Sequence, residues 1–150
     1  MEKNIELLKK YADKMGLEKP ATRAEISDFE KKNGVTFSED FKEFLLFANG
    51  GEIFVPGDVF FGVNDSSRYY SISREEKILD KIENSVPDGM VIVGKTNFGD
   101  PFFLEQKSGE VIEWDHESDE ESLRWKSFGE FLKDQIDEAL EILGEENLAD

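Results

Sequence analysis

The spacing of apolar residues changes twice along this chain, and that change limits the possible fold more than any other feature. Apolar side chains recur at three- and four-residue intervals over residues 5–48, as on helices that bury one face. Residues 52–114 hold short apolar runs separated by turn residues, a pattern typical of strands in hairpins. Helical spacing returns after residue 127. This order predicts an α+β fold, with N-terminal helices and a C-terminal helix packed on a largely antiparallel, twisted sheet of about five to six strands.

The length of 150 residues suits one domain that spans residues 1–150 and buries a core without disulfides or metals. Thirteen phenylalanines can supply that core. Cysteine is absent, which excludes a disulfide framework, a thiol nucleophile and a thiolate metal site. No internal repeat or low-complexity linker divides the sequence, so we expect one domain.

Three helices are expected before residue 52. The first is predicted over residues 5–15 and ended by Gly16. Thr22 and Glu25 have the spacing of a capping box, in which each side chain accepts a hydrogen bond from the other residue's backbone amide. They therefore open a second helix, which Gly34 closes.

Ser38 is expected to cap the third helix, with Glu39 and Asp40 placed at its positive N-terminal end. The triplet 49–51, Asn-Gly-Gly, supplies residues that tolerate a left-handed backbone and should stop this helix after Ala48.

The rest of the chain is expected to form strands and two further helices. Strands are predicted over residues 52–55, 59–63, 90–93, 101–105 and 110–114, and two pairs of them form hairpins. A helical stretch with apolar residues from Ile72 to Ile82 lies between the second and third strands. Ser127 and Glu130 form another capping box that opens the last helix, which has apolar positions as far as Leu143.

Residues Gly89 to Thr96 match the phosphate-binding pattern G-x-x-x-x-G-K-[ST]. That motif requires a strand before the first glycine and a helix that begins at the lysine. Here a turn precedes Gly89, the four central residues are themselves a strand, and Pro101 soon follows. We interpret the match as coincidence and expect no nucleotide and no other cofactor.

His116 is the only histidine, and it stands between Asp115 and Glu117. Three consecutive side chains in a strand point to alternate faces, so a metal site formed by these three is not expected. A Ser-His-Asp triad is not excluded by composition, but the sequence has no G-x-S-x-G elbow. We favour a structural or surface role for His116, and we expect no enzymatic activity.

The net charge of −17 restricts the partners of this protein. It opposes binding to nucleic acid and to anionic membranes, and it favours a basic partner, although an acidic surface can also serve solubility alone. The charge is lopsided. Residues 1–75 carry 11 basic and 14 acidic side chains (−3), whereas residues 76–150 carry seven and 21 (−14). The N-terminus has no apolar signal core and no apolar run is long enough for a membrane span, so a cytoplasmic location is expected.

The densest acidic cluster follows the predicted strand that ends in Trp114. Its members are Asp115, Glu117, Asp119, Glu120 and Glu121, and we expect them in a loop. Such a charge run is most often a solvated surface. The functional interpretation is a docking surface for a basic protein, which carboxylates steer into place and nearby aromatic side chains anchor.

Several segments together resemble the SUKH superfamily of Smi/Knr-type domains. In the first half they are residues 25–30, 34–45 and 49–51, and in the second half Gly94 and residues 97–100, 102–104, 109–111, 114–117 and 127–132. The resemblance runs from about Thr22 to Lys133. It rests on the order and spacing of these segments. Ser38 departs from the family pattern, which commonly has proline there.

This resemblance implies an α+β fold without enzymatic activity. Small bacterial single-domain members resemble immunity proteins, which bind and neutralise toxin domains, often nucleases. Fungal members resemble regulators of cell-wall assembly. The expected role is therefore a cytoplasmic antitoxin with a cognate toxin as partner, a basic nuclease domain. The alternative is a regulatory or scaffold module for an endogenous partner.

Overall fold

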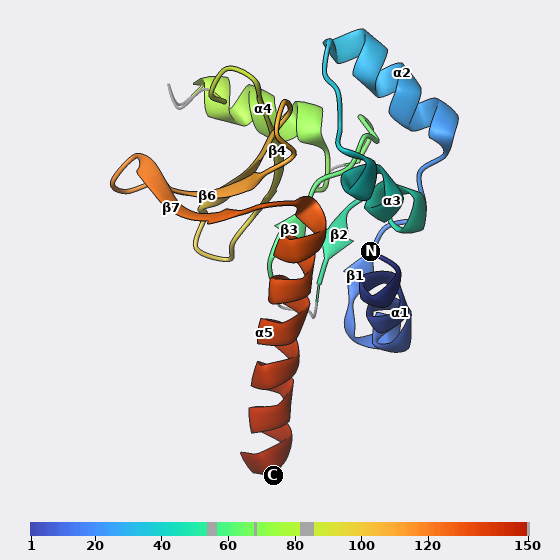
Figure 1. Ribbon diagram of the computed structural model, residues 1–150, viewed down its shortest axis with the longest axis vertical. Coiled ribbons are helices and arrows are strands. Elements are labelled where there is room, and N and C mark those ends of the chain that lie inside the picture. Colours follow the sequence, from blue (N-terminus) through green and yellow to red (C-terminus); the bar gives the residue numbers. More distant parts are fainter. Residues whose placement is uncertain (54–56, 68, 82–85, 150) are drawn as a thin grey trace.

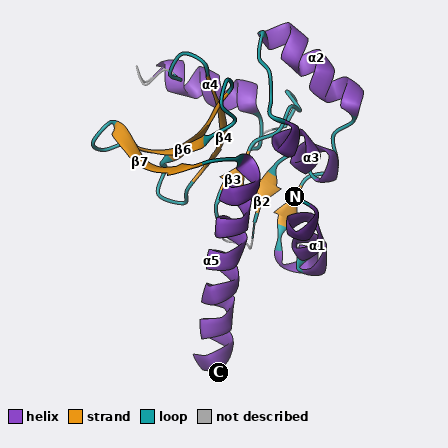
Figure 2. Ribbon diagram, in the orientation of Figure 1, coloured by secondary structure: helices purple, strands orange, loops and turns teal. Residues whose placement is uncertain are grey.

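Seven strands follow one another across one antiparallel sheet in the order in which they occur along the chain. The computed structural model describes residues 1–53, 57–67, 69–81 and 86–149. Within these residues the strands are β1 (Gly16–Leu17), β2 (Gly51–Glu52), β3 (Val59–Phe60), β4 (Met90–Lys95), β5 (Pro101–Glu105), β6 (Val111–Asp115) and β7 (Glu120–Trp125). Figure 2 shows them surrounded by helices on several sides, with the β6–β7 hairpin reaching away. The predicted α+β class and antiparallel sheet are confirmed.

The described residues form five α-helices and one short 3₁₀-helix. They are α1 (Glu2–Lys10), η1 (Ala12–Lys14), α2 (Arg23–Asn33), α3 (Glu39–Phe47), α4 (Ile72–Lys81) and α5 (Phe128–Ala149). Figure 1 shows α5 as a long rod that extends well beyond the sheet, with α1 beside it. The side-chain amide of Asn4, in α1, donates a 3.0 Å hydrogen bond to the carbonyl of Gly129, in α5. The first and last helices of the chain therefore pack together.

Two further strands, β1 and β7, raise the strand number above the predicted five to six. β1 was not expected, because residues 11–15 continue the helical spacing of α1 and Gly16 was interpreted as a helix end. Instead α1 ends at Lys10, and the backbone becomes extended at Met15, after which Gly16 pairs with Glu52 of β2. Pairing with a segment 36 positions away thus overrides the local pattern. Four residues of the predicted elements lie outside the described residues. They are Phe54 and Val55 of the predicted strand, Pro56 of its turn and Ile82 of the predicted helix.

The helix starts confirm the capping predictions in part. The Thr22–Glu25 capping box is complete, with bonds of 3.1 Å and 3.0 Å, and Gly34 closes α2 at φ 63°. At α3 the expected side-chain cap by Ser38 is wrong: its hydroxyl donates to Asp40 Oδ1 at 2.6 Å.

The Asn-Gly-Gly segment after α3 does more than stop a helix. The buried Asn49 accepts a 2.8 Å hydrogen bond from the amide of Val63 through its side-chain oxygen. A Cβ on Gly50 would lie 2.7 Å from the carbonyl oxygen of Phe60. The segment therefore allows close approach between backbones at the start of the sheet.

The main core lies on the sheet face that α3 and α5 cover. Phe60 packs against Phe44 of α3, and Phe102 packs edge-to-face on Phe131 of α5, with ring centroids 4.7 Å apart. Adjacent strand residues point to opposite faces, so Phe103 turns away from Phe102 and toward the α4 side. The sheet thus offers a second, less covered face to the site described next.

Candidate functional site

The acidic cluster of the second half lies on the β6–β7 hairpin, which projects from the body of the molecule (Figure 1). The expectation of a loop is wrong for Asp115, which belongs to β6, and for Glu120 and Glu121, which belong to β7. Glu120 pairs across the ladder with Asp115, the last residue of β6. The structure therefore brings all five predicted acids, Asp115, Glu117, Asp119, Glu120 and Glu121, to one end of one hairpin.

Three of these five carboxylates have partners within the hairpin. Asp115 Oδ1 accepts hydrogen bonds from the amides of Glu117 (2.9 Å) and Ser118 (3.2 Å), and these bonds lower the pKa of Asp115. Asp119, at a φ of 57°, accepts a 3.0 Å bond from the indole nitrogen of Trp114.

Glu121 is the third, and it forms a two-bond ion pair with Arg124 at 2.7 Å and 3.0 Å. Its pKa is lowered, chiefly by these bonds to Arg124. Within the described residues no side-chain hydrogen bond or ion pair engages the exposed carboxylates of Glu117 and Glu120. Of the five acids, these two therefore offer the whole carboxylate to a partner.

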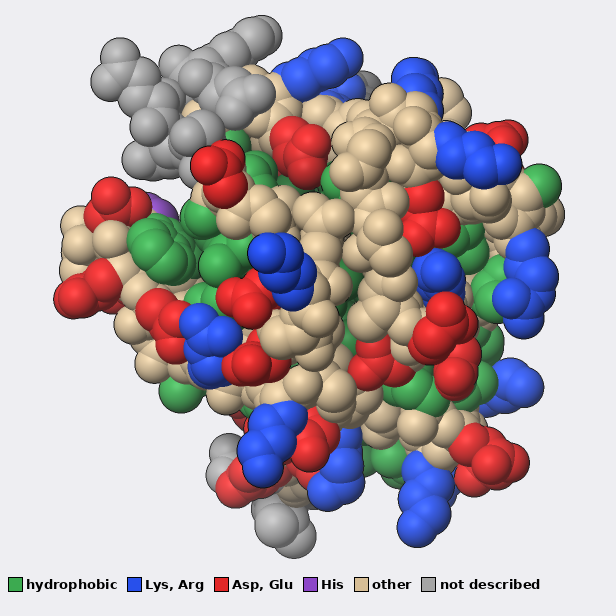
Figure 3. Space-filling view, turned by 45° about the horizontal axis from the view of Figure 1, so that its top comes forward, with side chains coloured by type: hydrophobic (Ala, Val, Ile, Leu, Met, Phe, Trp, Pro, Cys, Tyr) green, Lys and Arg blue, Asp and Glu red, His purple; other side chains and the backbone are tan. Residues whose placement is uncertain are grey.

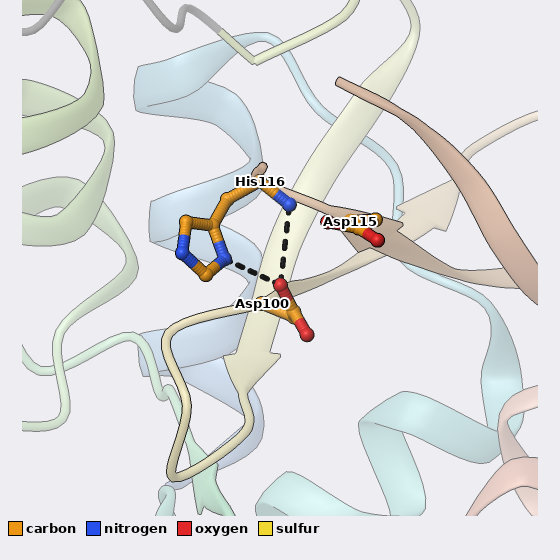
Figure 4. Close-up of side chains that lie close together, drawn as sticks. All are labelled: Asp100, Asp115 and His116. Carbon is orange, nitrogen blue, oxygen red and sulfur yellow. Dashed lines mark hydrogen bonds and ion pairs between the residues drawn. The ribbon is translucent and has the colours of Figure 1, made fainter. Parts of the chain in front are cut away.

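His116 joins this hairpin to the turn between β4 and β5. Its backbone amide donates a 3.1 Å bond to Asp100 Oδ1, and its ring Nδ1 donates to the same oxygen (Figure 4). The hydrogen bond to Asp100 raises the pKa of His116 above 6.5. The predicted structural role for His116 is consistent with these two bonds, and sequence reasoning missed Asp100 because it lies 16 residues away.

Asp100, Asp115 and His116 also place ligand-type atoms within 4.8 Å of one another (Figure 4). A metal there would use a different set from the three consecutive residues 115–117 weighed in the sequence. The carboxylates of Asp100 and Asp115 already accept two hydrogen bonds each from nearby backbone and ring groups. These bonds give the cluster a structural explanation as a brace between two turns.

A cavity of about 180 Å³ opens beside the hairpin on the α4 face of the sheet. Its walls are mostly apolar and come from α4, the segment before β4, and strands β4 to β6: Leu79, Pro87, Ile92, Pro101, Phe103 and Trp114. Glu75, Lys95, His116 and Asp119 also line it. Figure 3 shows hydrophobic surface next to the histidine and to acidic side chains at the left of the view.

The phosphate-loop match is resolved by this geometry. Residues Met90–Lys95 form β4, and Lys95 extends from the strand to pair with Glu75 of α4 at 3.2 Å. The next element after β4 is another strand, β5, so no helix starts at the lysine. The backbone arrangement that the motif requires is absent from this described segment, and the interpretation as coincidence is confirmed.

The sequence that forms most of this sheet and its helices matches a known family. The model of the SMI1/KNR4 family (SUKH-1) matches residues 20–134. The chain belongs to this family. The match covers almost the same segment as the resemblance over residues 22–133, and the family includes immunity proteins.

Two individual proteins are also similar to this SMI1/KNR4 chain, one in sequence and one in structure. Uncharacterized protein YnaB of Bacillus subtilis (strain 168) is 63% identical over 35 residues, which are 23% of this chain and 24% of that protein. A crystal structure of a protein from Pseudomonas syringae pv. tomato superposes with a TM-score of 0.70 at 18% identity. The superposition covers 91% of this chain and 99% of that one, so the two share a fold. Among the described residues no helix has the length and apolar character that crossing a membrane requires.

Proposed function

We propose that this SMI1/KNR4 domain is a non-enzymatic immunity protein that binds and neutralises a cognate toxin domain in the cytoplasm, a basic nuclease. The acidic end of the β6–β7 hairpin is the surface that meets the toxin. The observation that carries this proposal is the pair of exposed, unengaged carboxylates of Glu117 and Glu120 at the tip of a projecting hairpin. They stand in the half of the chain that has a net charge of −14.

Carboxylates at a projecting tip suit this role for a physical reason. A nuclease holds its substrate through cations that contact phosphate groups. Acidic side chains that reach the same cations compete with the nucleic acid and also steer association over a distance. Because bonds to Asp115 and Asp119 fix the turn of the hairpin, Glu117 and Glu120 are presented on a preorganised frame.

The test begins with capture of the tagged protein from its own cells and identification of what it holds by mass spectrometry. A secreted protein that ends in a small basic domain would then be expressed with and without this chain. We expect growth arrest by the toxin alone and rescue by co-expression.

The surface is tested with two matched double variants. Glu117→Lys with Glu120→Lys should lower the association rate about tenfold at low salt and flatten its salt dependence. Glu6→Lys with Asp13→Lys makes the same change in net charge on exposed sites of the first 14 residues and should leave the rate nearly unchanged. Equal rates for both variants would remove the hairpin from the interface. Capture of an endogenous envelope or signalling protein would favour the alternative role as a regulatory module.

A further inference from the structure

The cavity beside the β6–β7 hairpin has the size of one side chain. Its volume is about 180 Å³, and a cavity of about 150 Å³ lined by aliphatic and aromatic groups holds one benzene ring. Sites for drug-sized ligands begin at about 300 Å³. The size therefore favours a single aromatic or large aliphatic group over a whole metabolite.

The cavity floor is apolar and its polar groups are already paired. Phe103 and Trp114 meet edge-to-face, with ring centroids 6.4 Å apart, and the indole nitrogen of Trp114 is satisfied by Asp119. Lys95 is occupied by Glu75. A nonpolar group can therefore enter without leaving any of these polar atoms unpaired.

The rim gives the cavity a net negative surrounding. Among the lining residues, Lys95 is balanced by Glu75, and His116 pairs with Asp100, which leaves the carboxylate of Asp119 uncompensated by a cation. Asp115 and Glu117 do not line the cavity, but they flank His116 in the sequence and add negative charge beside it. Phe98, in the β4–β5 turn, is 85% exposed, and the adjacent Gly99 lines the cavity. An apolar hollow with an exposed aromatic residue and an acidic rim is the arrangement of an anchoring pocket in a protein interface.

We infer that this cavity receives one aromatic side chain of a partner protein, next to an arginine or lysine of the same segment that contacts the acidic rim around Asp119. The inference rests on the proposed function, because it names the contact through which a basic toxin would be anchored. The aromatic group supplies the slow dissociation, whereas the free acids of the hairpin tip supply the fast association.

The first test uses blocked dipeptides and does not need the toxin. N-acetyl-Phe-Arg-amide is titrated into the full chain while the two tryptophan indole N–H signals are followed by NMR. Trp114 lines the cavity, whereas Trp125 donates to Asp134 at 2.7 Å and does not line it, so Trp125 is an internal control. We expect the Trp114 signal to move, with about fivefold weaker binding for the Phe-Glu and Ala-Arg analogues.

Cavity-filling variants give the second test. Leu79→Trp should abolish the Trp114 response, and Ile78→Trp, one position away on α4 at a residue that does not line the cavity, should preserve it. Asp119→Asn keeps an acceptor for the Trp114 indole and removes the charge. It should therefore reduce the preference for Phe-Arg over Phe-Glu. This variant tests the inference independently if Leu79→Trp fails to fold. An unmoved Trp114 signal, or equal binding of benzyl alcohol and Phe-Arg, would overturn the inference.

Binding measurements with a captured toxin separate this inference from the proposed function. If a captured toxin binds, Leu79→Trp should raise its dissociation rate about tenfold or more with little change in association. A toxin that binds Leu79→Trp and wild type equally would overturn the cavity contact and leave the immunity role intact. If the dipeptide binds but the captured partner is not a toxin, the cavity contact stands and the immunity role is overturned.

Discussion

Asp40 of α3 accepts a 2.9 Å hydrogen bond from the backbone amide of Gly129, 89 residues further along the chain. Gly129 lies in the first turn of α5, where backbone amides lack partners inside the helix. The other carboxylate oxygen of Asp40 accepts from Ser38 and from the amide of Phe41. One half-buried carboxylate thus serves the starts of two helices.

Replacing Asp40 by alanine should therefore destabilise the fold by about 2 kcal/mol, because it leaves amides of two helix starts unpaired. Chemical denaturation measures this change. Asp40→Asn keeps an acceptor oxygen and should recover part of the loss. Glu39→Ala, at an exposed neighbour in the same helix, is the control, and a loss equal to that of Asp40→Ala would contradict the role given to Asp40.

Gly62→Ala should be among the most damaging single substitutions in the chain. A Cβ at this position would lie 2.2 Å from both the carbonyl and side-chain oxygens of Asn49, whose side chain also accepts from Val63. Relief of this clash must break that buried bond or separate the backbones, at a cost of about 3 kcal/mol or more. Gly144→Ala, where an added Cβ meets nothing within 4 Å, should leave the unfolding midpoint the same or higher. Equal midpoints for Gly62→Ala and wild type would show that this close approach is not needed.

The single histidine should titrate above pH 6.5. Its bond to Asp100 favours the protonated ring and raises the pKa of His116. The contribution of this pair to stability is therefore present at pH values below the unfolded pKa and is lost as pH rises through the folded pKa. An NMR titration of the ring protons follows this directly. In Asp100→Asn the pKa should fall toward its ordinary value, and an unchanged titration curve would argue against the bond.

Asp58 should limit stability at neutral pH. Burial, followed by the nearby acids Glu138 and Glu113, raises the pKa of Asp58 to about 6, against a backbone hydrogen bond from Asn97 that lowers it. The folded state thus binds this proton more tightly than the unfolded state, and the free energy of unfolding falls as pH rises from about 4 to 6.

Asp58→Asn keeps an acceptor for Asn97 and removes the buried charge. It should raise stability at pH 7 by about 1 to 2 kcal/mol and have little effect at pH 4, a difference that thermal unfolding at the two pH values can measure. A variant that is less stable than wild type at pH 7 would show that the charged form is favoured.

Features whose partners lie close in sequence could be predicted. The Thr22–Glu25 capping box and the β5–β6 hairpin need only residues within one turn or one loop of each other. The end of α1 could not be predicted in this way, because it depends on the pairing of Gly16 with the distant Glu52. The cap that Asp40 provides for α5 was missed for the same reason.

The candidate site shows the same division. Its acids were identified from their density, but β7 was missed because only Leu123 and Trp125 among its six residues are apolar, which is too short an alternation to indicate a strand. As the edge strand of the sheet, β7 has a neighbour on one side only, and its charges discourage pairing with another chain. Asp100 and the cavity depend on contacts between β4, β5, β6 and α4 that no local pattern encodes.

The packing of α1 against α5 has a consequence for synthesis. While the chain emerges from the ribosome, α1, α2, α3 and the strands can form in order, since each strand pairs with the one made just before it. Asn4 and Asp40 nevertheless wait for Gly129, which is made only after all seven of these strands. The nascent domain therefore closes only after its last strand and the start of α5 have left the ribosome, so shorter nascent chains lack the contacts that join its two ends.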